Sequence, residues 1–298
     1  MPDPCIDADY NVRNTVAPAV FDHVIGEYRR ASVEAVQGLR GYPDIRYDPH
    51  SDQRLDIWGV TEKPAPAFLV VHGGYWRMLS RHDTSFMART LHRHGIVTVS
   101  VDYGLAPDTT LEEIIRQVRS AVAWLYRNGH THGIDPSRIV VGGSSAGGHL
   151  TGALMVGGWQ DELDLPPDVV RAALPISGLF DLRPLVDSFA NEWLALTSER
   201  AAAASPALHV GPPGPSCVIA VAEHDGRGFL DQSRRFHQLW SPHAPSRLLV
   251  VPDRNHYDVF LDLAEPDSLL TRALLDLVAG TSTNADRPSA PHGAGHGE

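Results

Sequence analysis

One serine stands in a sequence context that could make it a nucleophile. Ser145 occupies the middle of Gly143-Ser144-Ser145-Ala146-Gly147, a G-x-S-x-G pattern that follows an apolar, β-branched run and precedes a segment able to form a helix. A serine at such a strand-to-helix turn is held at a tight corner with its hydroxyl exposed. The N-terminus of the helix directs N–H groups at the same place. We therefore expect Ser145 to be a catalytic nucleophile; the alternative is a Gly/Ser-rich loop without a catalytic role.

A serine hydroxyl needs a base that takes its proton and a third group that orients the base. Asp225 and His256 can supply both, because each follows an apolar, strand-like run (218–221 and 248–251). The chain order Ser, Asp, His, with each residue after its own strand, is typical of α/β-hydrolases. We expect Ser145, His256 and Asp225 to form a catalytic triad. The alternatives for the acid are Glu223 first, then Asp253 and Asp258. The alternative for His256 is that it is simply one of the 16 histidines of the chain, placed on a surface loop without a catalytic role.

A glycine pair follows another apolar run, in His72-Gly73-Gly74-Tyr75-Trp76. Acyl hydrolysis passes through a tetrahedral intermediate, whose oxyanion backbone N–H groups can stabilise. Glycine lets the backbone approach that oxygen closely. We expect N–H donors from Gly73 or Gly74, with Tyr75 as a further candidate, and from Ala146 after the serine. The alternative is a glycine turn that only joins a strand to a helix.

Two large aromatic residues, Tyr75 and Trp76, come directly after the glycine pair. Next to an oxyanion hole they are candidates for contact with an aromatic acyl or leaving group. The alternative is that they fill the core between this loop and a cap, and the sequence leaves both interpretations open. Cys217 precedes an apolar run, which indicates core packing rather than chemistry.

The sequence contains no motif for a cofactor or a metal. It lacks His-Glu-x-x-His, spaced cysteine pairs and the phosphate-binding pattern Gly-x-x-x-x-Gly-Lys-Ser/Thr. His92 and His94 have no carboxylate at metal-ligand spacing, and His292 and His296 lie near the C-terminus. We therefore expect chemistry that needs neither a cofactor nor a metal.

The net charge of the chain argues against polyanionic partners. The 298 residues include 25 basic and 36 acidic ones, a net charge of −11, which argues against binding to nucleic acid or to an anionic membrane. Two distant cysteines, Cys5 and Cys217, favour a reducing compartment. Residues 1–5 lack the features of a signal peptide, and no apolar run is long enough to span a membrane. We expect a cytoplasmic protein with a small-molecule aryl amide or ester as its partner; the oligomeric state stays open between a monomer and a homodimer.

Apolar runs alternate with segments of helical periodicity along most of the chain, which indicates a mainly parallel sheet with helices on both faces. The expected strands and helices are an edge hairpin (45–47 and 55–58), strands at 67–71, 96–101, 172–176, 218–221 and 248–251, and helices at 82–94, from the Thr110/Glu113 capping box to Gly129, after Ser145, and at 267–278.

We expect a single α/β domain over residues 1–280. Residues 1–40 form an N-terminal cover or lid in this interpretation, with a helix whose apolar face holds Phe21, Val24, Ile25 and Tyr28. Residues 180–215 form an insertion able to build a small cap, with Phe180, Phe189, Trp193 and Leu196. Residues 281–298, rich in Pro, Gly and His, are predicted to be a disordered tail.

These motifs together resemble the serine-dependent kynurenine formamidase (arylformamidase) branch of the α/β-hydrolases. His72–Trp76 and Gly143–Leu150 carry most of the resemblance. Further matching segments extend it over roughly residues 9–279: Tyr10–Arg13, Leu55–Trp58, Asp102–Pro107, Ser177–Leu182, Phe229–Ser233 and His256–Tyr257. The resemblance implies an α/β-hydrolase fold and hydrolysis of an N-formyl aryl amide, such as N-formyl-L-kynurenine to kynurenine and formate.

One position departs from the family that the chain resembles. Where that family usually has an acidic residue just before the phenylalanine, this chain has Gly226-Arg227-Gly228-Phe229. Another aryl amide, an ester or a carbamate therefore remains an alternative substrate. A general carboxylesterase is the alternative enzyme, and a hydrolase-fold binding protein without turnover is the alternative outside catalysis.

Overall fold

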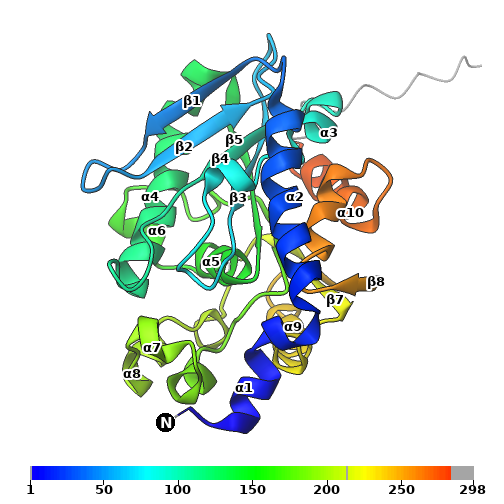
Figure 1. Ribbon diagram of the computed structural model, residues 1–298. Coiled ribbons are helices and arrows are strands. Elements are labelled where there is room, and N and C mark those ends of the chain that lie inside the picture. The colour runs from blue at the N-terminus through cyan, green and yellow to red at the C-terminus, as the bar shows by residue number, and fades with distance from the viewer. Residues whose placement is uncertain (1, 213, 283–298) are drawn as a thin grey trace, which may run out of the picture.

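The computed structural model describes residues 2–212 and 214–282 and forms one eight-stranded sheet (Figure 1). The strand order is β1-β2-β4-β3-β5-β6-β7-β8. The first two pairings of this order, β1 with β2 and β2 with β4, are antiparallel, and all the others are parallel. The strands are β1 (Gly41–Arg46), β2 (Arg54–Trp58), β3 (Ala65–Val71), β4 (Val97–Val101), β5 (Ile134–Ser144), β6 (Ala172–Ile176), β7 (Ser216–His224) and β8 (Ser246–Asn255). The expected hairpin at a sheet edge and the mainly parallel sheet are both confirmed.

Helices cover the sheet on both faces, and each face has its own buried core. The helices are α1 (Pro4–Tyr10), α2 (Pro18–Val36), α3 (Ala88–Arg93), α4 (Leu111–Asn128), α5 (Ala146–Met155), α6 (Trp159–Glu162), α7 (Asn191–Leu194), α8 (Ser198–Ala203), α9 (Arg227–Trp240) and α10 (Leu269–Gly280). Leu69 and Val71 of β3 pack in the cluster shared with α4, α5 and α9, while Phe68 and Val70 pack with α2, α3 and α10. Successive side chains of a strand point to opposite faces, which explains why β3 is apolar throughout.

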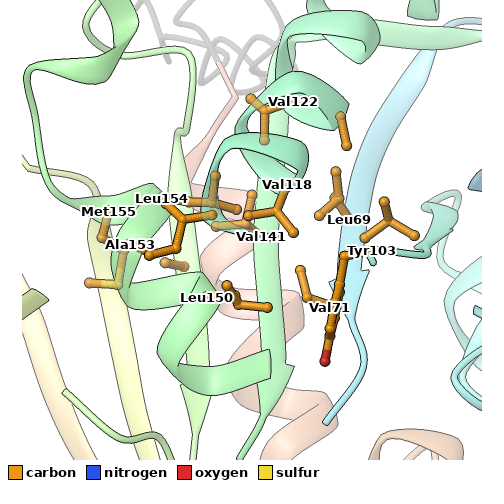
Figure 2. Close-up of a cluster of buried hydrophobic side chains, with 14 of the residues drawn as sticks. Leu69, Val71, Tyr103, Val118, Val122, Val141, Leu150, Ala153, Leu154 and Met155 are labelled. Carbon is orange, nitrogen blue, oxygen red and sulfur yellow. The ribbon is translucent and has the colours of Figure 1, made fainter. Parts of the chain in front are cut away.

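The core under α5 fixes the position of the turn that precedes this helix. Figure 2 shows Leu150 and Leu154 of α5 gathered with Val118 of α4 and with Val71 and Val141 of the sheet. A fully buried aliphatic side chain contributes about 1.5–3 kcal/mol to stability. Packing of this kind holds α5 against the sheet directly behind Ser145.

The helix that begins after Thr110 agrees with the prediction, whereas the helix expected at 82–94 does not. The hydroxyl of Thr110 accepts from the N–H of Glu113 at 3.4 Å, which is the N-cap half of the predicted capping box, whereas the Glu113 carboxylate accepts from Arg116. In the 82–94 segment only α3 (Ala88–Arg93) is α-helical, after a short 3-10 turn at Arg81–Asp83. Arg81 accounts for the shorter helix. Its backbone N–H and its guanidinium both bind Asp102, which follows β4, and these contacts hold the start of the segment against the strand end outside a continuous α-helix.

The N-terminal segment of the chain packs on the outside of other helices, α1 against α9 and α2 against α3. α1 and a 3-10 turn at Val12–Thr15 lead into the long helix α2, which runs along one side of the sheet in Figure 1. Within the described chain, no helix combines the length and the apolar character needed to cross a membrane. The tail predicted for 281–298 lies outside the described residues from residue 283 onward. Thr281 is buried, and its hydroxyl accepts from Nε of Arg138 at 3.1 Å.

Candidate active site

Ser145, His256 and Asp225 come together in one hydrogen-bonded chain. Ser145 follows β5, Asp225 follows β7 and His256 follows β8. Nε2 of His256 lies 3.0 Å from Oγ of Ser145, and Nδ1 lies 2.8 Å from Oδ1 of Asp225. A carboxylate can only accept, so Nδ1 carries the proton and Nε2 is free to accept from the serine hydroxyl. The tautomer is the one that general-base chemistry needs.

Backbone strain and close packing hold Ser145 at its corner. Ser145 has φ 60° and ψ −118°, a conformation that non-glycine residues rarely adopt. Its N–H donates to the carbonyl of Ile176 at 2.9 Å. A Cβ atom at Gly143 would lie 2.4 Å from the carbonyl oxygen of Val71, and one at Gly147 would lie 2.1 Å from the same oxygen. Both glycines of the pattern are therefore required by contact with β3.

The competing acids occupy other positions. Glu223 is exposed, and its carboxylate accepts from the N–H of Asp253 at 3.0 Å. Asp258 accepts from the N–H of Asn255 at 2.7 Å. Asp225 is 9% exposed, and its Oδ1 also accepts from the N–H of Gly226 at 2.7 Å. Asp225 is therefore the acid that can orient His256.

The glycine loop after β3 lies directly beside the serine turn. A Cβ atom at Gly73 would come within 2.8 Å of the carbonyl oxygen of Ser144 and 3.4 Å of Cβ of Ser145. Gly74 has φ +93°, and Tyr75 and Trp76 follow in left-handed conformations with φ 50° and 57°. This arrangement brings the backbone of the glycine pair next to the serine, as an oxyanion hole requires.

Hydrogen bonds from distant parts of the chain hold this loop. Tyr103 donates to the carbonyls of His72 and Gly73 at 3.0 and 3.1 Å, and its ring stacks on His72 with centroids 3.9 Å apart. The indole N–H of Trp193 donates to the carbonyl of Tyr75 at 3.0 Å. The Tyr75 hydroxyl in turn donates to the carbonyl of Tyr10 in the N-terminal segment. The loop is thus tied to the sheet, to the 180–215 segment and to α1.

Trp76 corrects one of the expectations about substrate contact. Its side chain is fully buried and lies outside the cavity lining, whereas Tyr75 lines the cavity. The indole N–H of Trp76 donates to Nδ1 of His149 at 3.3 Å, and Nε2 of His149 lies 2.8 Å from the carbonyl of Ala204. Because indole only donates, His149 accepts at Nδ1 and donates from Nε2. Burial lowers the pKa of His149 to about 4, so this bridge is neutral.

A cavity of about 260 Å³ opens beside Ser145 and His256. Its walls are mostly apolar and aromatic, which is typical of sites for small organic ligands. Sequence reasoning identified Tyr75, the glycines and the insertion aromatics Phe189 and Trp193. It also expected residues 1–40 to form a cover or lid, but it assigned none of them to the cavity wall. The signal for this part of the wall was the apolar face expected for the first long helix, because Phe21, Ile25 and Tyr28 of that face line the cavity. The other lining residues are Asn11, Val12, Arg13, Arg77, Met78, Leu79, Tyr257 and Phe260.

Two further groups have the chemistry of ligands or nucleophiles but lie outside this cavity. Glu223, His224 and Asp253 are exposed, and their ligating atoms lie within 4.8 Å of one another. The hydrogen bond between Glu223 and Asp253 accounts for their proximity. Cys217 is buried in the core as expected, and burial raises the pKa of its thiol to about 12.

Comparison with known proteins places this geometry in a family. The BD-FAE family model matches residues 55–239. The chain is 28% identical to the kynurenine formamidase of Salmo salar over 271 residues, which cover 86% of this chain and 90% of that protein. It is 25% identical to the kynurenine formamidase of Drosophila melanogaster over 280 residues, which cover 87% of this chain and 89% of that one.

Solved structures show the same fold. A crystal structure of a protein from Silicibacter sp. TM1040 superposes with a TM-score of 0.77 at 26% identity, covering 92% of this chain and 98% of that one. The carboxylesterase EstE1, cloned from a metagenomic library, superposes with a TM-score of 0.70 at 20% identity, covering 89% of this chain and 96% of that one. The chain belongs to the BD-FAE family and is an arylformamidase-like α/β-hydrolase.

Proposed function

We propose that this protein is a serine hydrolase that cleaves aryl formamides of the N-formyl-L-kynurenine type through a formyl-enzyme. The observation that carries the proposal is the chain of hydrogen bonds from Asp225 through His256 to Ser145 at the wall of an aromatic cavity. The kynurenine formamidases among its relatives support the choice of substrate class.

Each residue of the site has a role of its own in this reaction. Nε2 of His256 takes the proton of Ser145 as Oγ attacks the formyl carbon, and Asp225 stabilises the imidazolium that forms. The oxyanion receives N–H donors from Gly73, Gly74 and Ala146. His256 then gives the proton to the departing aryl amine. A water molecule then attacks the formyl-enzyme as the same imidazole takes its proton. The imidazolium gives that proton to Oγ as formate leaves, which restores Ser145.

The cavity wall supports an aryl leaving group. Tyr75, Phe189 and Trp193 pack edge to face with ring centroids 5.4–6.1 Å apart. Aromatic pairs in this arrangement form a stable apolar wall. An aryl ring beside Ser145 would be buried against these side chains, while the small formyl group faces the glycine loop.

A general carboxylesterase is the second candidate. Ester and amide carbonyls pass through the same tetrahedral intermediate, and the cavity wall is mostly apolar. Other aryl amides or carbamates fall under the same reasoning. Short acyl groups are expected in each case, because the glycine loop lies directly beside the serine.

The test is a hydrolysis panel of aryl formamides, the matching acetamides and p-nitrophenyl esters, with Ser145→Ala and a control variant. Loss of the nucleophile should lower kcat by several orders of magnitude, whereas Ser137→Ala, at an exposed position of β5, should keep wild-type rates. A fluorophosphonate probe should label the wild type at Ser145. Wild-type turnover by Ser145→Ala refutes the triad. Faster hydrolysis of esters than of formamides favours the carboxylesterase, and a folded protein without turnover or labelling is a binding protein.

A further inference from the structure

Two arginine side chains line the otherwise mostly apolar cavity, and the proposed contact with an aryl ring gives them no role. Among the described residues that line it, the side chains with a fixed charge are Arg13 and Arg77, and none is aspartate or glutamate. The chain as a whole carries a net charge of −11. The two guanidinium groups favour a ligand of opposite charge at short range, because salt screens the more distant charges of the protein beyond about 8–10 Å.

Arg77 has no ion pair within residues 2–212 and 214–282. Its guanidinium carbon lies 4.3 Å from the ring centroid of Trp193. The indole N–H of Trp193 is itself held by the carbonyl of Tyr75 at 3.0 Å. Arg77 therefore lies on a fixed aromatic ring, and stacking of this kind leaves the in-plane N–H groups free to donate.

Arg13 comes from the N-terminal segment and is held in a similar way. Its guanidinium carbon lies 3.4 Å from the ring centroid of Phe21. Asp22 pairs with it at 3.6 Å, but both side chains are well exposed, at 41% and 72%, so the pair is weak. The carboxylate of Asp22 lies outside the cavity lining. Among the described residues, Arg77 thus has no ionic partner, and Arg13 has only a weak one.

A carboxylate is the group that these two side chains recognise best, because guanidinium N–H groups match its two oxygens. An ammonium group would find no carboxylate in the described lining. The ring faces of Phe21 and Trp193, which could otherwise attract it, are already covered by the guanidinium groups.

We propose that the site prefers aryl formamides or esters whose leaving group carries a carboxylate and no ammonium, with Arg13 and Arg77 as the specificity-determining residues. This inference rests on the proposed function and narrows it from a zwitterionic amino acid to an anion. Both arginines would bind the end of the leaving group that lies away from Ser145.

Three matched substrates test it. Formylkynurenine is a zwitterion, its desamino analogue is an anion, and the carboxamide of that analogue is neutral. We expect wild-type kcat/KM for the anion to exceed the values for the other two by about tenfold, the usual effect of one hydrogen bond to a charged group. The advantage should shrink as ionic strength rises.

Variants assign the effect to the two side chains. Arg77→Gln and Arg13→Gln should each reduce kcat/KM for the anion about three- to tenfold and reduce the value for the neutral carboxamide much less, so that the ratio between the two substrates falls. Retained hydrolysis of the carboxamide also reports correct folding. Asp22→Asn, which frees Arg13, should raise the preference for the anion. Arg93→Gln, an exposed residue of α3 outside the lining, is the control and should behave as the wild type.

The inference is wrong if the wild type hydrolyses formylkynurenine or the carboxamide as well as the anion, or if both arginine variants keep the preference. In either case hydrolysis of formamides still supports the proposed function. Absence of hydrolysis of all three substrates, with no probe labelling at Ser145, refutes the proposed function instead.

Discussion

The indole N–H of Trp193 donates to the backbone carbonyl of Tyr75 at 3.0 Å, across 118 positions of the sequence. Tyr75 is in a left-handed conformation with φ 50°, and Trp76 continues it with φ 57°. Each such non-glycine residue costs roughly 1–2 kcal/mol. The hydrogen bond from Trp193 therefore helps to hold a strained loop in the one shape that brings the glycine amides to Ser145.

Replacing this indole with a phenyl ring should affect catalysis more than binding. In Trp193→Phe the aromatic wall and the platform for Arg77 persist, but the donor to Tyr75 is lost. A neutral hydrogen bond is worth about 1 kcal/mol, or about fivefold in rate. We expect kcat to fall about fivefold with a smaller change in KM, measured by steady-state hydrolysis of a formanilide.

The matched control for this variant is Trp124→Phe. Trp124 lies on α4 against His132, outside the cavity lining. It should keep the wild-type kcat. An unchanged kcat in Trp193→Phe, together with a raised KM, would mean that Trp193 contacts substrate and does not position the loop.

Gly74→Ala should damage the loop directly. Gly74 has φ +93°, and an added Cβ would lie 2.3 Å from the carbonyl oxygen of Met78. Because this oxygen is a backbone atom, it cannot move without moving the chain. Displacing one oxyanion donor typically lowers kcat by about 10²–10³. We expect a loss of that order, with the free energy of unfolding lowered by at least about 1 kcal/mol.

A second glycine provides the comparison. Gly26→Ala on α2 adds a Cβ with nothing within 4 Å, so it should stabilise the fold by roughly 0.5–1 kcal/mol and leave kcat unchanged. Urea unfolding and steady-state rates measure both variants. Normal activity in Gly74→Ala would show that the hole is built elsewhere.

His149 should make the stability of the protein depend on acidity. Burial is the main cause that lowers its pKa to about 4, and the carbonyl of Ala204 opposes this effect only in part. In the unfolded chain histidine titrates near pH 6.5. The unfolded state therefore binds the extra proton first, and the stabilising contribution is complete above about pH 6.5 and is lost as the pH falls towards 4.

The control variant is His149→Gln, whose amide can accept from Trp76 and donate to Ala204 without titrating. Between about pH 7 and pH 4 the free energy of unfolding of the wild type should fall by roughly 3 kcal/mol more than that of the variant. His72 is buried too, and burial also lowers its pKa, but it is present in both proteins and its effect cancels. Parallel pH profiles in urea unfolding would contradict the neutral bridge.

The sheet and the serine turn were predictable because local rules decide them. β3 is apolar along its length since it is buried on both faces. Gly143 and Gly147 both pack against the carbonyl of Val71. This contact leaves no room for a side chain, so the two glycines of the motif already indicate it in the sequence. The helix α9 also had a readable signal in Phe229, Phe236 and Trp240, which recur at helical spacing and are fully buried.

Other features depend on contacts that the sequence does not signal. Trp76 turns into the core and Tyr75 into the cavity because both adopt positive φ values, which such residues rarely do. The helix expected at 82–94 is shortened by the ion pairs of Arg81 with Asp56 and Asp102, which are distant in the chain. Long-range polar contacts override local propensity in these places.

The identity of the triad acid gives the last prediction. Asp225→Asn should lower kcat by about 10³–10⁴, because an amide can donate to Nδ1 of His256 and so stabilises the tautomer with the proton on Nε2, where it cannot accept from Ser145. Glu223→Gln should change kcat by less than about twofold, since its exposed carboxylate binds the N–H of Asp253 and not the imidazole. Single-turnover hydrolysis of an aryl formamide compares the two. A large loss in Glu223→Gln with little change in Asp225→Asn would transfer the role to Glu223 and require His256 to turn away from the 2.8 Å contact that it makes with Asp225.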